Sequence, residues 1–255
     1  MQNKYGLTRE IPAAVKRAVR QRDGFGCVVC GCALIEYEHF EPEFAEARAH
    51  QVGGIILLCA GCHAKKTRGH LSRDTIAMAK ANPATKKLGF SFEAFDVGGN
   101  YPEIALGKMV GRETPSLIRI LDEDVLQVLP PEQGGGPFRL SACFRDSNEN
   151  VVLCIDENEW RSPTTNWDVE VVGRRIAVRQ AQGSIAVVLR TDLPNRLTVE
   201  RLDLAHRGFR IECREGHLTS VRTPSGVEVQ IDGGTFVRAK GMIVLDGKGV
   251  GIGFL

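Results

Sequence analysis

The chain has 255 residues, a formal net charge of +2 and 43% hydrophobic residues. This composition excludes a disordered or fibrous protein, and no apolar run approaches the length of a membrane-spanning helix. The first twelve residues lack the apolar stretch of a secretory signal, so we expect a cytoplasmic protein without stable disulfides. The length allows either one domain or two.

Charge is distributed unevenly along the chain. Residues 1–89 contain 14 Lys and Arg against 8 Asp and Glu, and residues 90–255 contain 19 against 23. The two parts therefore carry net charges of +6 and −4. This asymmetry indicates that contact with a polyanion is concentrated in the first part, with ordinary surface charge as the alternative.

The first predicted element is a short amphipathic helix. Pro12 suits the first turn of a helix, and apolar residues recur at helical spacing from Ile11 to Val19 before Asp23-Gly24 breaks the pattern. The other side of this helix carries basic residues that either contact phosphates or are simply solvated: Lys16, Arg17, Arg20 and Arg22.

The next segment predicts two tight Cys-x2-Cys knuckles with short strands and helices around them. Between and after the knuckles we expect a strand over 34–38, a polar loop over 40–54, a strand over 55–58, a helix starting at 63–68 and a helix over 72–80. Ser72 is the predicted N-cap of the last helix.

The cysteines of the two knuckles form two chelating pairs. Cys27 and Cys30 make the first pair, and Cys59 and Cys62 make the second after 28 intervening residues. Four thiolates complete a closed tetrahedral zinc site, so this spacing predicts a structural Zn2+ that staples the knuckles together. Cys32 is an alternative ligand, but the two-residue gap favours Cys30.

Three residues near the knuckles suit metal-assisted phosphodiester hydrolysis, which needs a cation and a base that deprotonates water. Adjacent side chains in a strand face opposite ways, so Glu38 can bind metal while His39 faces the water. A helix packed across the strands would bring His63 to Glu38 and leave His39 as the general base. Basic residues at the start of this helix suit phosphate, with a solvated face as the alternative: Lys65, Lys66 and Arg68.

Each of these three residues also has a structural interpretation. His39 can be a hydrogen-bonded structural histidine, His63 a spectator of the zinc knuckle, and Glu38 a residue that only orients His39.

This pattern resembles the HNH endonuclease family over roughly residues 9–70. The resemblance rests on Arg22-Asp-Gly-Phe-Gly-Cys-Val-Val-Cys-Gly, Glu38-His39, Gly53-Gly54 and Leu57-Leu-Cys-Ala-Gly-Cys-His-Ala-Lys-Lys-Thr. It implies a zinc-stapled ββα-metal fold, with His39 as general base and with Glu38 and His63 as ligands of a catalytic Mg2+ or Mn2+. It further implies hydrolysis of DNA to 5′-phosphate and 3′-hydroxyl ends.

The sequence departs from the family pattern at one position. The family usually has Asn five residues before the second CxxC, and this chain has Gly54 there. His50 or a backbone carbonyl near Gly53 can substitute for the missing amide, or activity is weakened or lost. The third ligand of the catalytic ion is open among Lys66, Thr67, the more distant His70 and water.

Residues 90–255 predict an all-β domain of sandwich or barrel type. Short alternating runs of Val, Ile and Leu are separated by turn signals rich in Gly, Asn and Pro. Trp160 and Trp167 belong either to the core, which is the commoner case, or to a recognition surface. The remaining cysteines are interpreted as small buried hydrophobes: Cys143, Cys154 and Cys213.

We therefore expect an α+β protein with an HNH nuclease domain at 1–89 and a β-rich recognition, regulatory or oligomerisation domain at 90–255. The expected function is metal-dependent DNA cleavage, in a bacterial restriction or anti-phage defence setting. The alternatives are a catalytically weakened zinc-ribbon DNA-binding protein and an assembly subunit of a defence complex. Besides DNA, the expected partner is a second copy or a defence protein bound through 90–255, and no membrane.

Overall fold

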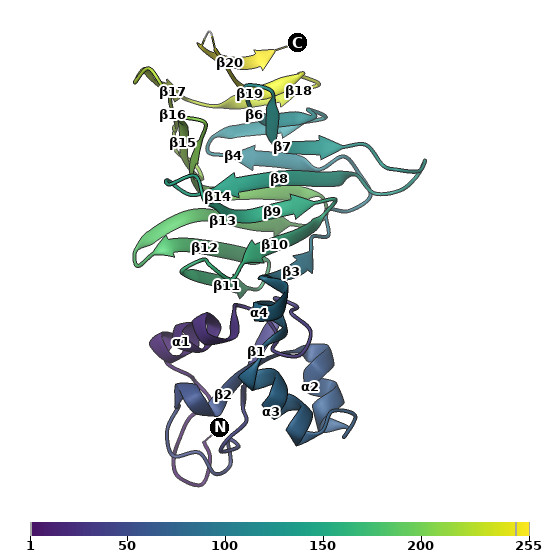
Figure 1. Ribbon diagram of the computed structural model, residues 1–255. Helices are drawn as coiled ribbons and strands as arrows, with labels where there is room; N and C mark the ends of the chain where they lie inside the picture. Colours follow the sequence, from purple (N-terminus) through teal and green to yellow (C-terminus); the bar gives the residue numbers. More distant parts are fainter. Residues whose placement is uncertain (1, 248, 255) are drawn as a thin grey trace. The chain divides into compact units, whose positions relative to one another are not determined.

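The computed structural model describes residues 2–247 and 249–254, and this part of the chain is mostly β (Figure 1). It forms two compact units, Met1–Glu93 with Ser162–Val171, and Ala94–Arg161 with Val172–Leu255. The segment Ser162–Val171, which includes most of a strand, belongs to the first unit. Within the described ranges, no helix is both long and apolar enough to span a membrane.

The first unit begins with helix α1 (Ala13–Asp23), which occupies the predicted segment. Pro12 precedes its first turn, and Gly24 ends it at a φ of 74°, with the Gly24 amide donating to the Arg20 carbonyl. A left-handed residue after the last turn is the usual way in which glycine stops a helix.

Three arginines of α1 form internal ion pairs, namely Arg17, Arg20 and Arg22. Neither of the predicted roles therefore applies to Arg20. Its guanidinium is only 4% exposed and donates from Nε and Nη2 to the two carboxylate oxygens of Asp168, at 2.8 and 2.7 Å. Arg17 Nε lies 3.4 Å from the same carboxylate, and its guanidinium stacks 4.9 Å from the ring centre of Trp167. These contacts hold Ser162–Val171 against α1 within the first unit.

The centre of the first unit is the antiparallel pair of β1 (Ile35–His39) and β2 (Ile55–Cys59). After β1 and a long loop, the short helix η1 (Val52–Gly54) leads into β2. The helices that follow are α2 (Ala60–Thr67), α3 (Arg73–Ala81) and α4 (Ala84–Leu88). The Ser72 hydroxyl accepts a hydrogen bond from the Thr75 amide and caps α3 as predicted.

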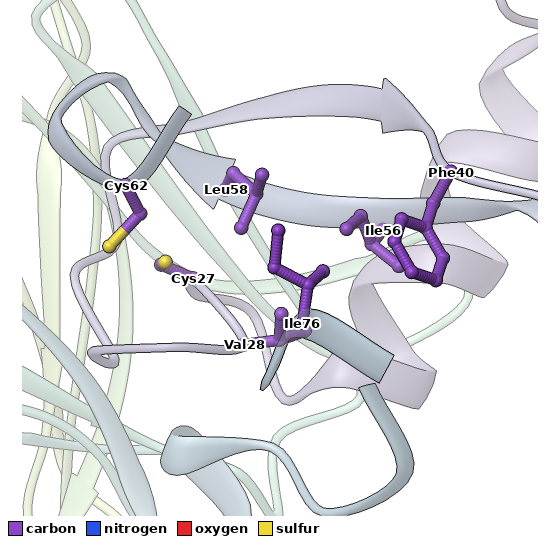
Figure 2. Close-up of a cluster of buried hydrophobic side chains, with 7 residues drawn as sticks. All are labelled: Cys27, Val28, Phe40, Ile56, Leu58, Cys62 and Ile76. Atoms are coloured by element: carbon purple, nitrogen blue, oxygen red, sulfur yellow. The ribbon is translucent and has the colours of Figure 1, made fainter. Parts of the chain in front are cut away.

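Strand β2 is buried on both faces because its alternate side chains enter two separate clusters. Ile55 and Leu57 pack with Ile11 and Val19 beside α1. Ile56 and Leu58 belong to a second cluster with the following members: Cys27, Val28, Phe40, Cys62 and Ile76 (Figure 2). Figure 2 shows that the sulfur atoms of Cys27 and Cys62 turn toward each other at one end of this cluster.

The remaining strands supply the β-rich part of the chain. They are β3 (Phe90–Ala94), β4 (Glu103–Leu106), β5 (Met109–Arg112), β6 (Ser116–Ile120), β7 (Glu123–Leu129), β8 (Arg139–Arg145), β9 (Val151–Asp156), β10 (Glu159–Pro163), β11 (Asp168–Val172), β12 (Arg175–Ala181), β13 (Ser184–Asp192), β14 (Arg196–His206), β15 (Phe209–Arg214), β16 (Thr219–Arg222), β17 (Glu228–Ile231), β18 (Gly234–Val237), β19 (Gly241–Asp246) and β20 (Gly249–Phe254).

The described residues of the second unit form strands and turns without a helix. One sheet runs in the order β20-β19-β6-β7-β8-β9-β10, and another runs β12-β13-β14-β15-β16-β17. Most neighbours are antiparallel hairpins, while β19 lies parallel to β6 and β4 parallel to β14. The sheets approach each other where β14 meets β8 and β12 meets β9.

Alternation along the strands sorts side chains between the core and the outer faces of this unit. Trp160 is 1% exposed and belongs to the core, as does Cys213 at 6%. Cys143 and Cys154, which the sequence analysis interpreted as buried hydrophobes, are only partly buried. They occupy directly opposed positions on β8 and β9, on the face that alternates with the core residues.

Candidate functional site

The first unit brings the four predicted cysteines into one cluster. Cys27 and Cys30 lie on the turn before β1, Cys59 is the last residue of β2, and Cys62 lies in the first turn of α2. Their sulfur atoms all lie within 4.8 Å of one another. Tetrahedral Zn–S bonds of about 2.3 Å place thiolates about 3.8 Å apart, so the cluster has the donor set and spacing of a four-cysteine metal site.

Local backbone structure explains why the two knuckles face each other. The Gly31 amide donates to the Cys27 carbonyl at 2.8 Å, and Gly31 has a φ of 89°, which suits glycine. The sulfur of Cys59 accepts from the Cys62 amide at 3.4 Å and so caps α2. Helix α2 therefore begins at Ala60, three residues earlier than the predicted His63.

The thiols of this cluster shift one another's pKa through hydrogen bonds and charge. A hydrogen bond from Cys30 lowers the pKa of Cys27 to about 5, although burial acts in the opposite direction. Burial raises the pKa of Cys62 to about 12. A cluster of four close thiols therefore retains protons on some members, and a bound cation is what would favour four thiolates together.

Cys32, the alternative ligand, points to a different partner. Its Sγ lies 3.0 Å from Oε2 of Glu93, and its residue forms a parallel bridge with Phe92. Burial, and then the nearby carboxylate, raise the pKa of Cys32 to about 12. The four-sulfur cluster contains Cys30 instead, in agreement with the two-residue spacing.

Glu38 and His63 meet at the interface of β1 and α2. Oε2 of Glu38 lies 3.2 Å from Nε2 of His63, and Oε1 of Glu38 accepts from Nζ of Lys66. Both the carboxylate and the imidazole are partly exposed, with side-chain exposures of 22% for Glu38 and 36% for His63. A carboxylate oxygen and an imidazole nitrogen at this separation suit shared coordination of one divalent ion.

Glu36 is a site residue that the sequence analysis did not single out. Its Oε2 lies 4.0 Å from Nδ1 of His63, and its side chain is 60% exposed. The period of two along β1 places Glu36 and Glu38 on the same face of the strand. The alternation Glu36-Tyr37-Glu38 was therefore the available signal for a second carboxylate at this position.

His39 occupies the opposite face of β1 and is 9% exposed. Its Nε2 forms a hydrogen bond of 3.1 Å with Nδ1 of His50, and the Phe44 ring packs edge-on 5.4 Å from its ring centre. Burial, with a smaller contribution from His50, lowers the pKa of His39. The described residues provide no hydrogen bond to Nδ1 of His39.

Gly54 shows why an asparagine side chain is absent at this position. A Cβ added to Gly54 would lie 2.7 Å from the Glu41 carbonyl oxygen, closer than real Cβ atoms approach. The Gly54 carbonyl accepts from the Phe40 and Glu41 amides at 2.8 and 3.1 Å. The backbone itself thus fixes the end of β1, while His50 contacts the imidazole of His39.

The loop after β1 is also held by Asn3, whose role the sequence analysis missed. Its side-chain amide donates to the carbonyls of Phe44 and Ala47, both at 2.6 Å. Its Oδ1 accepts from the Tyr5 and Leu7 amides at 3.0 Å. No local pattern identifies Asn3, because its partners in this loop lie more than 40 residues away.

The residues predicted to bind phosphate lie at the C-terminal end of α2, whereas the sequence analysis placed them at the start of this helix. Lys65 and Lys66 belong to the last turn of α2, and Arg68 is its C-cap, because the helix already begins at Ala60. The free backbone amides of a helix N-terminus are therefore not beside them. Cations are favoured at a helix C-terminus, and Lys65 and Arg68 are exposed, whereas Lys66 pairs with Glu38.

Comparisons of the chain with protein-family models, with curated protein sequences and with solved structures give no match.

Proposed function

We propose that the first unit is a zinc-stapled, metal-dependent endonuclease site of the HNH kind that hydrolyses DNA. The observation that carries the proposal is the 3.2 Å approach of Glu38 to His63, beside a four-sulfur cluster and next in sequence to His39. Metal-assisted phosphodiester hydrolysis needs this combination of an open cation site and a neighbouring base. The resemblance to the family supports the same assignment.

Zinc in the cysteine cluster would have a structural role. Cys27 and Cys30 precede β1, whereas Cys59 and Cys62 join β2 to α2. A closed four-thiolate site leaves no position for substrate, so its contribution is to fix α2 relative to the strand pair. This fixation keeps His63, on α2, at Glu38, on β1.

The catalytic ion would be held by Glu38 and Nε2 of His63. Glu36, whose carboxylate lies on the Nδ1 side of the same imidazole, adds negative charge beside this site. Mg2+ or Mn2+ bound there supplies positive charge for the scissile phosphate and the leaving oxygen. Lys66, which pairs with Glu38 in this structure, becomes available to a phosphate oxygen when Glu38 binds a cation. Lys65 and Arg68 extend this positive surface.

His39 would act as the general base through Nδ1. His50 holds Nε2 by the 3.1 Å hydrogen bond, and the ring of Phe44 limits rotation of the imidazole. A base whose ring is held in one orientation needs less reorganisation when it accepts the proton of the attacking water. His50 then has the orienting role that an asparagine has in the family pattern.

A second candidate function is binding of DNA without cleavage. It is favoured by the ion pair of Lys66 with Glu38, which occupies the carboxylate that would otherwise bind metal. Under this alternative the zinc staple and the basic surface remain useful, while the acidic and imidazole groups are structural. The two candidates differ in one measurable property, which is cleavage.

The test uses the full-length protein and supercoiled plasmid, with Mg2+ or Mn2+ titrated at constant ionic strength. The expected result is metal-dependent nicking by the parent protein and no nicking by His39→Ala. Glu38→Ala and His63→Ala should nick the plasmid only at raised metal concentration, because each lacks one ligand of the ion. His217→Ala is the matched control, because His217 is an exposed histidine of the second unit. Zinc content is measured for every variant, so that loss of folding is recognised.

Binding is measured on the same preparations by gel shift at several salt concentrations. Plasmid binding by the parent without any metal-dependent cleavage would favour the second candidate. Cleavage by His39→Ala at the parental rate would refute the assignment of the base.

We place this activity in a bacterial defence setting, with the β-rich unit as the part that directs cleavage. The test of this role compares cleavage of plasmid that carries the host's DNA modification with cleavage of plasmid that lacks it.

A further inference from the structure

The second unit contains a pair of thiols outside the site described above. Cys143 on β8 and Cys154 on β9 are directly opposed in the antiparallel register, and their sulfur atoms lie 2.8 Å apart. The neighbouring pair Ala142 and Ile155 is buried, at 5% and 2% exposure. Because side chains alternate, the two thiols project from the opposite face, where both are partly exposed.

This geometry suits a covalent bond between the two sulfurs. Directly opposed residues of an antiparallel pair have Cα atoms about 4.5 to 5.5 Å apart, inside the range of about 4.4 to 6.8 Å found for disulfides. A disulfide bond of about 2.0 Å requires the two sulfurs to approach by less than about 1 Å. Small side-chain rotations are sufficient for this change, and the strands already hold the correct register.

We propose that Cys143 and Cys154 form a redox-active dithiol that closes reversibly into a disulfide by exchange with a low-molecular-weight disulfide. The Cys143 thiolate attacks one sulfur of the small disulfide, giving a mixed disulfide and releasing one thiolate. The Cys154 thiolate then attacks the Cys143 sulfur and releases the second. The two cysteines lose two electrons and two protons in total, and the small disulfide becomes two thiols.

The electrostatic surroundings make Cys143 the attacking thiol. A hydrogen bond from Cys154 lowers the pKa of Cys143 to about 7, with a further contribution from the Arg145 cation and against the effect of burial. The same hydrogen bond raises the pKa of Cys154. Arg161 lies on β10 directly opposite Cys154 of β9, and its cation adds positive charge beside the two thiols. The thiolate is the reactive form of cysteine, so attack begins at Cys143.

The other cysteine of this unit lacks these features. Cys213 is 6% exposed, and burial raises its pKa to about 12. It forms its strand pair with Leu202 rather than with another cysteine. Cys213 is therefore the internal reference for reactivity, and Cys213→Ser is the matched control variant.

The test is equilibration of the full-length protein in mixtures of reduced and oxidised glutathione, followed by acid quenching, alkylation and tryptic mass spectrometry. Cleavage after Arg139, Arg145 and Arg161 releases Leu140–Arg145 and Asp146–Arg161, which each contain one cysteine. We expect a linked peptide that accumulates as the fraction of oxidised glutathione rises. Dithiothreitol should remove it, and Cys213→Ser should leave its yield unchanged.

Single variants test whether both thiols are needed. In Cys154→Ser, the mixed disulfide on Cys143 should persist because the resolving thiol is gone. In Cys143→Ser, the linked peptide should be absent and glutathione bound to Cys154 should likewise persist, because no partner thiol remains to displace it. Recovery of the wild-type peptides only as separate thiols or separate glutathione adducts would overturn the proposal. The wild-type measurement retains this power even if a serine variant fails to fold.

Discussion

Replacing Asp168 by Asn removes the charge that neutralises Arg20 inside the first unit. Asp168 is fully buried and accepts from Nε and Nη2 of Arg20 at 2.8 and 2.7 Å. The same guanidinium donates to the Tyr37 hydroxyl at 2.8 Å, and Tyr37 lies on β1 between the two glutamates of the site. The substitution preserves shape while leaving a nearly buried cation without its main counterion.

The expected loss of stability follows from the burial of both partners. Removing one member of a buried ion pair costs about 3–5 kcal/mol, because the remaining charge stays desolvated. Domains of this size unfold with about 5–15 kcal/mol, so the loss is a large part of the total. With a urea dependence of about 1–3 kcal/mol per molar, the unfolding midpoint should fall by roughly 1–5 M.

The assay must report on the first unit alone, because a two-unit chain need not unfold in one step. Release of zinc to a chromogenic chelator during urea unfolding provides that signal. Glu170→Gln is the matched control, since Glu170 lies 3.2 Å from Arg20 but is 32% exposed. It should cost at most about 1 kcal/mol. An Asp168→Asn protein that releases zinc at the same urea concentration as the control would refute this reasoning.

Three further predictions concern the zinc knuckles and the loop after β1. Cys59→Ser should lose zinc and unfold the first unit, because zinc binding of about 10–16 kcal/mol matches or exceeds the stability of a domain. Elemental analysis should find no zinc in this variant and a full zinc content in the control Cys32→Ser. Gly31→Ala should lower stability by about 1–3 kcal/mol in urea, because it forces a Cβ into a φ of 89° and to 2.9 Å from the Leu88 side chain, while Gly61→Ala should not. Asn3→Ala should accelerate tryptic cleavage after Arg48, because it frees the carbonyls of Phe44 and Ala47. Cleavage of Asn3→Ala at the rate of the parent protein would contradict this role.

Local signals were sufficient for most elements of the first unit. Helix α1 starts after Pro12 and ends at Gly24, and α3 begins after Ser72, because caps act within one turn. The start of α2 was predicted three residues late. Its N-cap is a cysteine sulfur, and Cys59 has no strong capping signal in a sequence.

The membership of the cysteine cluster was also predictable, because the donors of a chelating pair are close in sequence. Glu38 and His63 were expected to meet, and they do so at 3.2 Å. The contact of His39 with His50 was only one of the alternatives left by the missing asparagine. Nor did the sequence indicate that the carbonyl of Glu41 leaves no space for a side chain at Gly54.

By itself, the sequence determined the features that depend on neighbours in the chain: the two cysteine pairs, the opposite faces of Glu38 and His39, and the β character of the remainder. Tertiary structure alone decided which residues far apart in the sequence form an ion pair, hold a loop by hydrogen bonds or bring two sulfur atoms together. Asp168 joins Arg20 from 148 residues away, and Cys143 meets Cys154 through strand register. The reason is physical: periodicity and capping act over a few residues, whereas a buried charge or a paired thiol takes its partner from whatever the fold places beside it.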